Sequence, residues 1–160
     1  MALRTIRIMG DKVLEKKCKE VKAMTPRTKQ LIGDMFETMY DACGVGLAAP
    51  QVGILKRICV IDTDGTPYVL INPVILETSG EQTGNEGCLS LPGQMGVVTR
   101  PNYVKVKALN ENMEEYVLEA TELLARAICH ETEHLDGIMF TSHVEGDLID
   151  VTEEYEETED

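Results

Sequence analysis

Two histidines and a glutamate late in the chain have the residue types and the spacing of a metal site. The stretch RAICHETEHLDG, residues 126–137, contains the pattern H-E-x-x-H at His130, Glu131 and His134. On a helix, two histidines four residues apart face the same side and can bind one metal ion, with the adjacent glutamate available as a general base. A catalytic site of this kind needs three protein ligands and one open position. The motif therefore predicts a metallohydrolase whose third ligand lies elsewhere.

The helical phase of these residues supports the metal interpretation. Each residue of an α-helix advances by about 100°, so the three motif residues share one stripe, with Leu123 and Ala127 in line behind the histidines. Burying two imidazoles and a carboxylate without compensation would cost several kcal/mol, and a metal ion removes that cost. The alternative is a surface helix whose polar residues match the motif by chance. We prefer the metal because the motif uses two of the three histidines in the chain.

Residues after the motif are poor candidates for the third ligand. One large class of metallopeptidases extends the motif to H-E-x-x-H-x-x-G-x-x-H. Here Gly137 fits that pattern, but Phe140 occupies the last histidine position. His143 lies three residues further on and is interpreted as a surface histidine. Other metallopeptidases use a later glutamate, but the acidic residues at that distance lie in EEYEETED, residues 153–160, which we expect to be disordered.

Two cysteines are closer candidates. Cys129 precedes His130, but helical geometry points its side chain about 100° away from His130 and roughly 140° away from His134. It is therefore expected to flank the site without binding the metal. The segment GNEGCLSLPGQ, residues 84–94, carries Cys88 on a predicted turn or strand, from which a thiolate could complete a Cys-His-His set. Because a lone cysteine in such a segment is more often a small buried residue, the residues alone leave the third ligand open.

The elements that must position these residues are an early helix, a run of strands and the motif helix. Segment 24–44 has apolar residues at helical spacing, with Thr25 as a candidate N-cap, Pro26 suited to the first helical position and Gly44 placed to end the helix. From about residue 57 to 119, RICVID, YVLINPVIL, VVTRPNYVKVKALN and EEYVLEA are rich in Val and Ile and predict strands. Helical periodicity returns at residues 121–137. This order predicts an α+β domain.

Composition and charge favour one cytoplasmic domain. The chain has 160 residues, and 43% of them are hydrophobic. No apolar run approaches the roughly 18 residues of a membrane span, and the first residues do not resemble a secretion signal. A net charge of −13 argues against binding to nucleic acids or anionic membranes. We expect a monomeric catalytic domain over residues 1–150, reduced cysteines, and an acidic disordered tail over residues 151–160.

Three motifs taken together resemble those of the peptide deformylase family. They are GVGLAAPQVG at residues 44–53, EGCLSLPG at 86–93 and HETEHLDG at 130–137. They occur in that family's order and at similar spacing, and GDKVL at residues 10–14 resembles its opening segment. The resemblance extends from about residue 6 to 143. Each motif alone is moderately specific, whereas all three in order are strongly specific.

The resemblance implies a metal centre, a fold and a substrate. Cys88, His130 and His134 would bind one divalent metal ion, usually Fe(II), with Zn(II), Ni(II) or Co(II) also able to occupy the site. The fold would be the family's α+β arrangement, with antiparallel and mixed sheets packed around a central helix that carries the H-E-x-x-H motif. The substrate would be the N-formylmethionine of newly made peptides at or near the ribosome, from which the enzyme would release formate.

The resemblance also implies roles for residues around the metal. Glu131 would act as general base and then as general acid, while the Gln51 amide and the backbone N–H of Leu89 would stabilise the developing oxyanion. Independently of the resemblance, Glu86 and Arg100 lie on either side of Cys88 and are predicted to pair across it, supporting the ligands from behind.

An apolar pocket is needed for the methionine side chain of such a substrate. Residues near the site by motif or by helix phase are expected to line it: Val45, Gly46, Leu123 and Ala127. Where many members of the family have glutamine before the first motif histidine, this chain has Cys129. We place that cysteine beside the site, in the pocket wall or behind the ligands. The departure touches no ligand, so the predicted activity is not in doubt.

Two other functions use the same metal helix. An endopeptidase would need the downstream histidine that this chain lacks, and the upstream cysteine argues against it. A structural metal domain would close the fourth position with a further cysteine and would hydrolyse nothing. Metal analysis combined with formate release from a formyl-methionyl peptide distinguishes all three.

Overall fold

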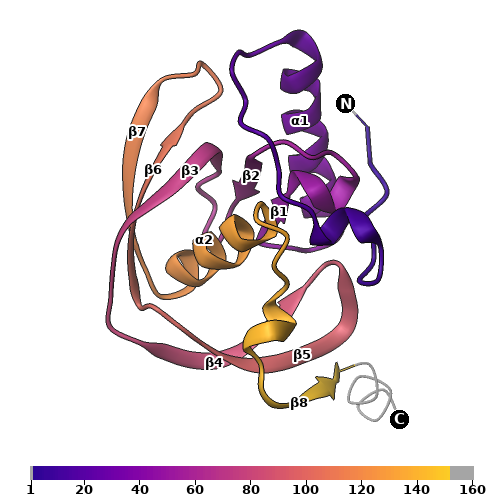
Figure 1. Cartoon of the computed structure of the whole chain (residues 1–160), viewed down its shortest axis with the longest axis vertical. Coiled ribbons are helices and arrows are strands. Elements are labelled where there is room, and N and C mark those ends of the chain that lie inside the picture. The colour runs from indigo at the N-terminus through magenta and orange to yellow at the C-terminus, as the bar shows by residue number, and fades with distance from the viewer. Residues whose placement is uncertain (1, 152–160) are drawn as a thin grey trace.

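The computed structural model describes residues 2–151, which form two α-helices, short 3₁₀-helices and eight strands (Figure 1). In chain order the elements are η1 (Lys12–Glu15), α1 (Pro26–Asp41), β1 (Gly46–Ala48), η2 (Ala49–Val52), β2 (Ile58–Ile61), β3 (Tyr68–Ser79), β4 (Gln82–Cys88), β5 (Leu91–Arg100), β6 (Tyr103–Leu109), β7 (Glu115–Thr121), α2 (Glu122–His134), η3 (Phe140–His143) and β8 (Glu145–Asp150). The predicted α+β class is confirmed. Within this part of the chain, no helix is long and apolar enough to cross a membrane.

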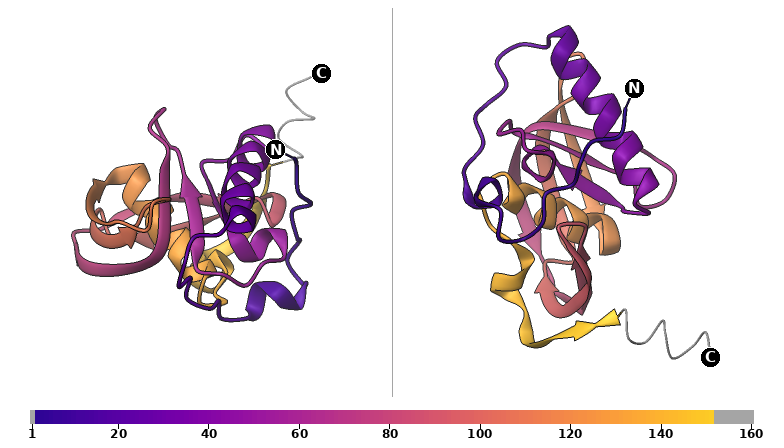
Figure 2. Two further views of the ribbon diagram at one scale, coloured as in Figure 1. Left: turned by 90° about the horizontal axis from the view of Figure 1, so that it is seen from above. Right: turned by 90° about the vertical axis from the view of Figure 1, so that its right-hand side faces the viewer.

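Antiparallel pairing joins the strands into two sheets. The larger sheet has the order β1-β2-β3-β6-β7 and the smaller one the order β4-β5-β8. Helix α2 contacts β1, β2, β6 and β7 of the larger sheet and β5 of the smaller one. In Figure 1 it lies across the middle of the molecule, with β3, β6 and β7 on one side and α1 on the other, and Figure 2 shows the same elements from two further directions.

Helix α1 begins as its sequence predicts. Thr25 is the N-cap, and its hydroxyl oxygen accepts a hydrogen bond from the Thr28 N–H at 3.1 Å, while Pro26 occupies the first helical position. Residues at helical spacing are buried on one face: Leu31, Ile32, Met35 and Met39. This face packs against the larger sheet.

The end of α1 differs from the prediction. The helix stops at Asp41, three residues before Gly44, because Cys43 adopts the left-handed conformation (φ 58°) that the prediction gave to the glycine. The N–H of Cys43 then bonds to the Tyr40 carbonyl, and the N–H of Gly44 to the Met39 carbonyl at 2.9 Å. These two bonds form a Schellman motif that satisfies the last carbonyls of the helix.

Strand β2 separates two apolar cores. Ile58 and Val60 face the core built with α1, whereas Cys59 and Ile61 face the core built with α2. Successive side chains of a strand point to opposite faces, so this edge of the larger sheet is covered by a helix on each side. The RICVID segment is therefore apolar without alternation because both of its faces are buried.

Several strands were not predicted. β1, β4, the first half of β5 and β8 are poor in Val and Ile and contain Gly, Gln, Asn and Asp. Such residues have low strand propensity, but cross-strand pairing overrides it. β8 pairs with β5 just before the predicted acidic tail. Of that tail, residues 152–160 lie outside the described part of the chain.

Candidate metal centre

Three side chains from two distant segments bring their ligand atoms together. Cys88 ends β4, whereas His130 and His134 lie one turn apart on α2. Nε2 of His134 lies 3.2 Å from Nε2 of His130 and 3.3 Å from Sγ of Cys88, and the three ligand atoms all lie within 4.8 Å of one another. A tetrahedral ion with nitrogen and sulfur ligands holds its donor atoms about 3.3–3.6 Å apart. The donor set therefore fits one ion of the zinc or iron type.

The β4–β5 hairpin presents Cys88 to the helix. Leu89 and Ser90 form its turn, and the strand register shifts between Gly87 and Cys88. A register shift of this kind redirects the side chain that follows it. The shift lies at the end of β4, where the Cys88 side chain faces α2.

Glu86 holds one of the histidine rings from behind. The Nδ1–H of His130 donates to Oε2 of Glu86 at 2.8 Å, which leaves Nε2 of that ring facing Cys88 and His134. Arg100 binds the same carboxylate through Nε at 3.1 Å and Nη2 at 2.7 Å, so the predicted Glu86–Arg100 pair is present. Burial would raise the pKa of Glu86, but the hydrogen bonds from His130 and Arg100 outweigh it and lower the pKa to about 2. This is the usual support for a metal-binding imidazole.

The two rings have different electrostatic environments. Burial, reinforced by the neighbouring His130 ring, lowers the pKa of His134 to about 3. Burial acts in the same direction on His130, but the Glu131 charge, together with Cys88 and Glu86, raises its pKa well above the usual value. The negative groups around His130 thus favour positive charge at this point, which a metal cation also supplies.

Glu131 faces the same space from the next position on α2. It is 4% exposed, and a Cβ placed on Gly46 would lie 2.4 Å from its Oε2, so only glycine lets β1 pass beside this carboxylate. Burial, reinforced by the charge of Glu86, raises the pKa of Glu131 to about 7. Among the described residues, no group donates a hydrogen bond to its buried Oε1. A buried carboxylate oxygen without a donor fits a partner, such as water, that the site must bind.

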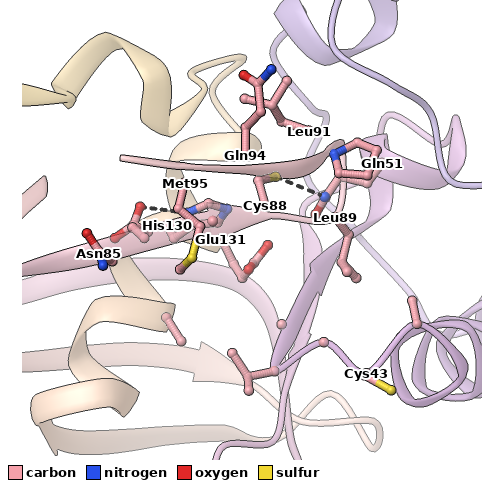
Figure 3. A pocket seen from close by; sticks show the side chains of 18 of the residues that line it. Cys43, Gln51, Asn85, Cys88, Leu89, Leu91, Gln94, Met95, His130 and Glu131 are labelled. Atoms are coloured by element: carbon pink, nitrogen blue, oxygen red, sulfur yellow. Dashed lines mark hydrogen bonds and ion pairs between the residues drawn. The ribbon is translucent and has the colours of Figure 1, made fainter. Parts of the chain in front are cut away.

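Gln51 reaches the centre from η2 with a defined orientation. Its Oε1 accepts a hydrogen bond from the Ala48 N–H at 2.9 Å, so its Nε2 must be the atom that faces the site. That nitrogen donates to Oγ of Ser90 at 3.1 Å and lies 3.5 Å from Sγ of Cys88, the contact drawn as a dashed line in Figure 3. Leu89, beside Cys88 in the hairpin turn, lines the same space.

The site lies beside a cavity of about 770 Å³. The predicted residues that line it are Val45, Gly46, Gln51, Glu86, Cys88, Leu89, Leu123, Ala127, His130 and Glu131. Figure 3 shows Cys88, His130 and Glu131 together along its wall, with Met95 and Asn85 beside them. Ile6 and Val151 also reach the cavity, although Val151 is the first residue of the predicted tail.

Cys129 lies elsewhere than expected, and His143 has a contact that was not expected. Cys129 is not among the cavity-lining residues but is 7% exposed within the apolar core on the α2 side of the sheet, where burial raises its pKa to about 11. His143 is exposed, as predicted, yet its Nε2 lies 2.6 Å from Oε2 of Glu133, whose other oxygen pairs with Arg100. The exposed histidine therefore joins the network that ends at Glu86.

Sequence reasoning missed three residues around the centre. Arg126 donates to Oε1 of Glu86 at 2.9 Å and lies one turn before His130, so helix phase alone could have found it. Phe140 packs its ring 5.8 Å from the His130 ring, centroid to centroid, at the position where other metallopeptidases place a third histidine. The Ser90 hydroxyl accepts a hydrogen bond from the Gln51 amide, and no pattern in the sequence indicated this contact.

The chain is similar to known proteins along most of its length. Residues 3–147 match the family model described as polypeptide deformylase. The chain is 62% identical over 160 residues to the peptide deformylase of Agathobacter rectalis, with all of both chains covered. It is also 62% identical over 140 residues to peptide deformylase 1 of Clostridium acetobutylicum, covering 88% of this chain and 93% of the other.

Solved structures agree with the sequence relatives. A peptide deformylase from Thermotoga maritima superposes with a TM-score of 0.88 at 39% identity, covering 90% of this chain and 99% of the other. A peptide deformylase from Synechococcus elongatus in complex with actinonin gives a TM-score of 0.86 at 45% identity, covering 88% and 78%. The resemblance seen in the three motifs is confirmed, and the chain belongs to the polypeptide deformylase family of enzymes.

Proposed function

We propose that the chain is a metal-dependent hydrolase that removes the formyl group from the N-terminal formylmethionine of newly synthesised peptides and releases formate. The observation that carries this proposal is the convergence of Cys88, His130 and His134 beside the buried Glu131 carboxylate in an apolar cavity. We propose one divalent ion at this point, with Fe(II) as the native metal. One thiolate and two imidazoles are also a suitable donor set for Zn(II), Ni(II) and Co(II).

When bound, a divalent ion supplies Lewis acidity, which increases the acidity of water and polarises a carbonyl group. Glu131 accepts the proton of the attacking water on its buried carboxylate and later delivers it to the nitrogen of the leaving amine. Gly46 leaves room for this carboxylate, because a Cβ at that position would collide with Oε2 of Glu131. The oxygen attacks the formyl carbon, the C–N bond breaks, and formate and a free N-terminus leave.

Gln51 and Leu89 stabilise the charge that develops on the formyl oxygen. The Ala48 N–H fixes the Gln51 amide so that its N–H₂ group points at the site, and Ser90 limits its movement. The backbone N–H of Leu89 is the second proposed donor, in the turn that follows Cys88. Each such donor is worth a factor of about 10²–10³ in rate.

The methionine side chain of the substrate enters the apolar part of the cavity. Leu123 and Ala127 supply the α2 side of that wall, and Val45 and Gly46 supply the side next to β1. Leu123 is 49% exposed and lines the cavity, so it offers apolar surface that a methionine side chain would cover.

We further propose that residues 1–150 form one catalytic domain in which α2 is the central, metal-carrying helix. Contacts of α2 with strands from both sheets support this assignment. The enzyme would act as a monomer in the cytoplasm, on peptides emerging at or near the ribosome.

The test combines metal content with product analysis. The protein, purified under anaerobic conditions and loaded in turn with Fe(II), Ni(II) or Zn(II), is incubated with a formyl-methionyl tripeptide and with the same peptide lacking the formyl group. The proposal expects one metal per chain and one formate per formylated peptide. Cleavage of an internal peptide bond would identify an endopeptidase instead, and bound metal without hydrolysis would indicate a structural site.

A further inference from the structure

Arg126 is a buried arginine that the proposed mechanism does not use. It lies on α2 between the pocket residues Leu123 and Ala127 and one turn before His130, and it is 7% exposed. The residue lines the cavity, although a buried guanidinium is an unusual choice beside a pocket for an apolar side chain. Its presence there needs a physical reason.

The contacts of the guanidinium supply that reason. Nη1 donates to Oε1 of Glu86 at 2.9 Å and to the Val98 carbonyl at 3.1 Å, and Nε lies 3.4 Å from Oε1 of Gln82. Arg126 therefore ties α2 to β4 and β5, the hairpin that presents Cys88 (Figure 1). Its positive charge is paired with the Glu86 carboxylate, which also binds His130.

The two oxygens of Glu86 divide the contacts between them. Oε2 accepts from Nδ1 of His130 at 2.8 Å and from Nη2 of Arg100 at 2.7 Å. Oε1 accepts from Nε of Arg100 at 3.1 Å and from Nη1 of Arg126 at 2.9 Å. Arg100 contacts both oxygens as a fork, and Arg126 adds a second, shorter hydrogen bond to Oε1, so each oxygen has two donors and the rotation of the carboxylate is limited further.

We propose that Arg126 is a positioning residue that couples the side-chain pocket to the metal centre, an inference that rests on the proposed function for the identity of the substrate. Its guanidinium holds Glu86 in the orientation that receives the His130 ring, and the same residue lines the cavity. A substrate side chain that packs against Arg126 therefore packs against the residue that orients a metal ligand.

The alternative is that Arg126 only fastens the helix to the hairpin. In that case its loss lowers stability without changing how His130 is held. Two variants separate these roles. Arg126→Met removes the guanidinium and keeps an unbranched stem, and Arg126→Lys keeps the positive charge but loses the fork that reaches both Glu86 and Val98.

Arg57→Met is a matched control. Arg57 also bridges α2 to another segment, since its Nη1 donates to the Leu135 carbonyl at 3.1 Å and pairs with Asp136 at 3.0 Å. It touches neither Glu86 nor the cavity. Its loss removes a half-buried arginine contact at the C-terminal end of α2 and should lower the melting temperature only.

The measurements follow His130 and the metal separately from the activity. In metal-free protein at one fixed pH, proton NMR records the hydrogen-bonded Nδ1–H of His130. In Zn(II)-loaded protein, the rate of metal release to excess chelator is recorded. Loss of a group behind a metal ligand typically costs about 10–100-fold in metal affinity or activity, so Arg126→Met should broaden or shift the Nδ1–H signal and release zinc about 10–100-fold faster.

Arg126→Lys should recover part of both losses, and Arg57→Met should match the unmodified protein in both. With formylated substrates, Arg126→Met should also change the ratio of kcat/KM between formyl-methionyl and formyl-alanyl peptides, because the pocket wall has changed. If Arg126→Met does not fold, Arg126→Lys decides alone: zinc release faster than in Arg57→Met supports the proposal.

An unchanged Nδ1–H signal and an unchanged release rate in the Arg126 variants, with only a lower melting temperature, would overturn the inference. Failure of the proposed function has a different signature. In that event the unmodified protein releases no formate, whereas the NMR signal and the zinc release rate still report whether Arg126 positions His130.

Discussion

The two α-helices cover the same edge of the larger sheet from opposite sides, yet they bury different chemistry. Helix α1 buries aliphatic and thioether side chains: Leu31, Ile32, Met35 and Met39. Helix α2 buries ionisable ones beside its apolar residues: Arg126, His130, Glu131 and His134. Helix α1 also buries one carboxylate, Asp34, but that group pairs with Arg4 of the N-terminal segment at 3.0 Å. The buried polar groups of α2 find their partners on the strands that the helix faces.

The difference follows from the free energy of burial. Removing apolar surface from water stabilises the fold by roughly 25 cal/mol per Å² and requires only close packing. A buried charge left without its partner costs about 3–5 kcal/mol. Helix α2 therefore depends on β4 and β5, which supply Glu86, Arg100 and Cys88, whereas α1 packs apolar side chains against the sheet. Damage to α1 should lower stability, and damage on the pocket side of α2 should lower metal binding and catalysis.

The largest expected effect comes from the thiol that completes the site of α2. Cys88→Ala should lose both the metal and the activity, because two imidazoles alone make a weak site. Cys88→Ser should lose activity too, since a neutral hydroxyl is a poorer ligand. Metal content per chain and formate release decide the outcome. Stoichiometric metal in Cys88→Ala would show that the third ligand has been misassigned.

The second effect separates chemistry from metal binding on the same helix. Glu131→Gln should keep the fold and the metal but lose formate release by several orders of magnitude, because the carboxylate is proposed to move a proton and not to bind the ion. Metal analysis of the purified variant accompanies the kinetics. A parallel loss of metal would mean that Glu131 is a ligand.

The third effect belongs to α1. Met35→Ala, at a position with no exposed surface, should lower the free energy of unfolding by about 2–5 kcal/mol through the cavity that it leaves. Because Met35 touches the core on the far side of the sheet from α2, the metal content and kcat should stay unchanged at 25 °C. Urea unfolding and single-temperature kinetics test this. A drop in metal content of the folded protein would show that the two helices are not independent.

The smallest effect concerns the cysteine that adjoins His130 in sequence. Cys129→Ala should keep stoichiometric metal and full activity, with a loss of about 1 kcal/mol in stability, since its side chain packs in the apolar core and not in the cavity. The comparison with Cys88→Ala is the sharpest one, because the two cysteines differ only in which neighbours the fold gives them. If Cys129→Ala loses the metal while Cys88→Ala retains it, the assignment of ligands is reversed.

The sequence was most informative where the geometry is local. The H-E-x-x-H spacing and the position of Ala127 follow from the turn of a helix, so the shared face of His130 and Glu131 was predictable from residue numbers. The start of α1 at Thr25 and Pro26 was predictable for the same reason. The end of that helix was not, because Cys43 adopts a conformation that its residue type disfavours.

The third metal ligand was only partly predictable from local sequence. The residues alone left Cys88 as one possibility, and only the resemblance of three motifs selected it. The missed strand β4 explains why: QTGNEGC has little strand propensity, and its pairing with β5 turns Cys88 toward α2. Pairing across a hairpin and packing against a distant helix depend on residues that no local window contains.

By itself, then, the sequence determined the chemistry that this protein carries: two imidazoles and a carboxylate on one helical face, with glycine-rich and cysteine-bearing segments of a recognisable family. Only the tertiary structure decided which groups surround that chemistry. It placed Arg126 and His130 on the carboxylate that pairs with Arg100, Phe140 against His130, and Cys129 in the core. The contacts of this carboxylate join segments up to 44 residues apart, as between Glu86 and His130, and they exist because buried polar groups must find partners wherever the fold brings them.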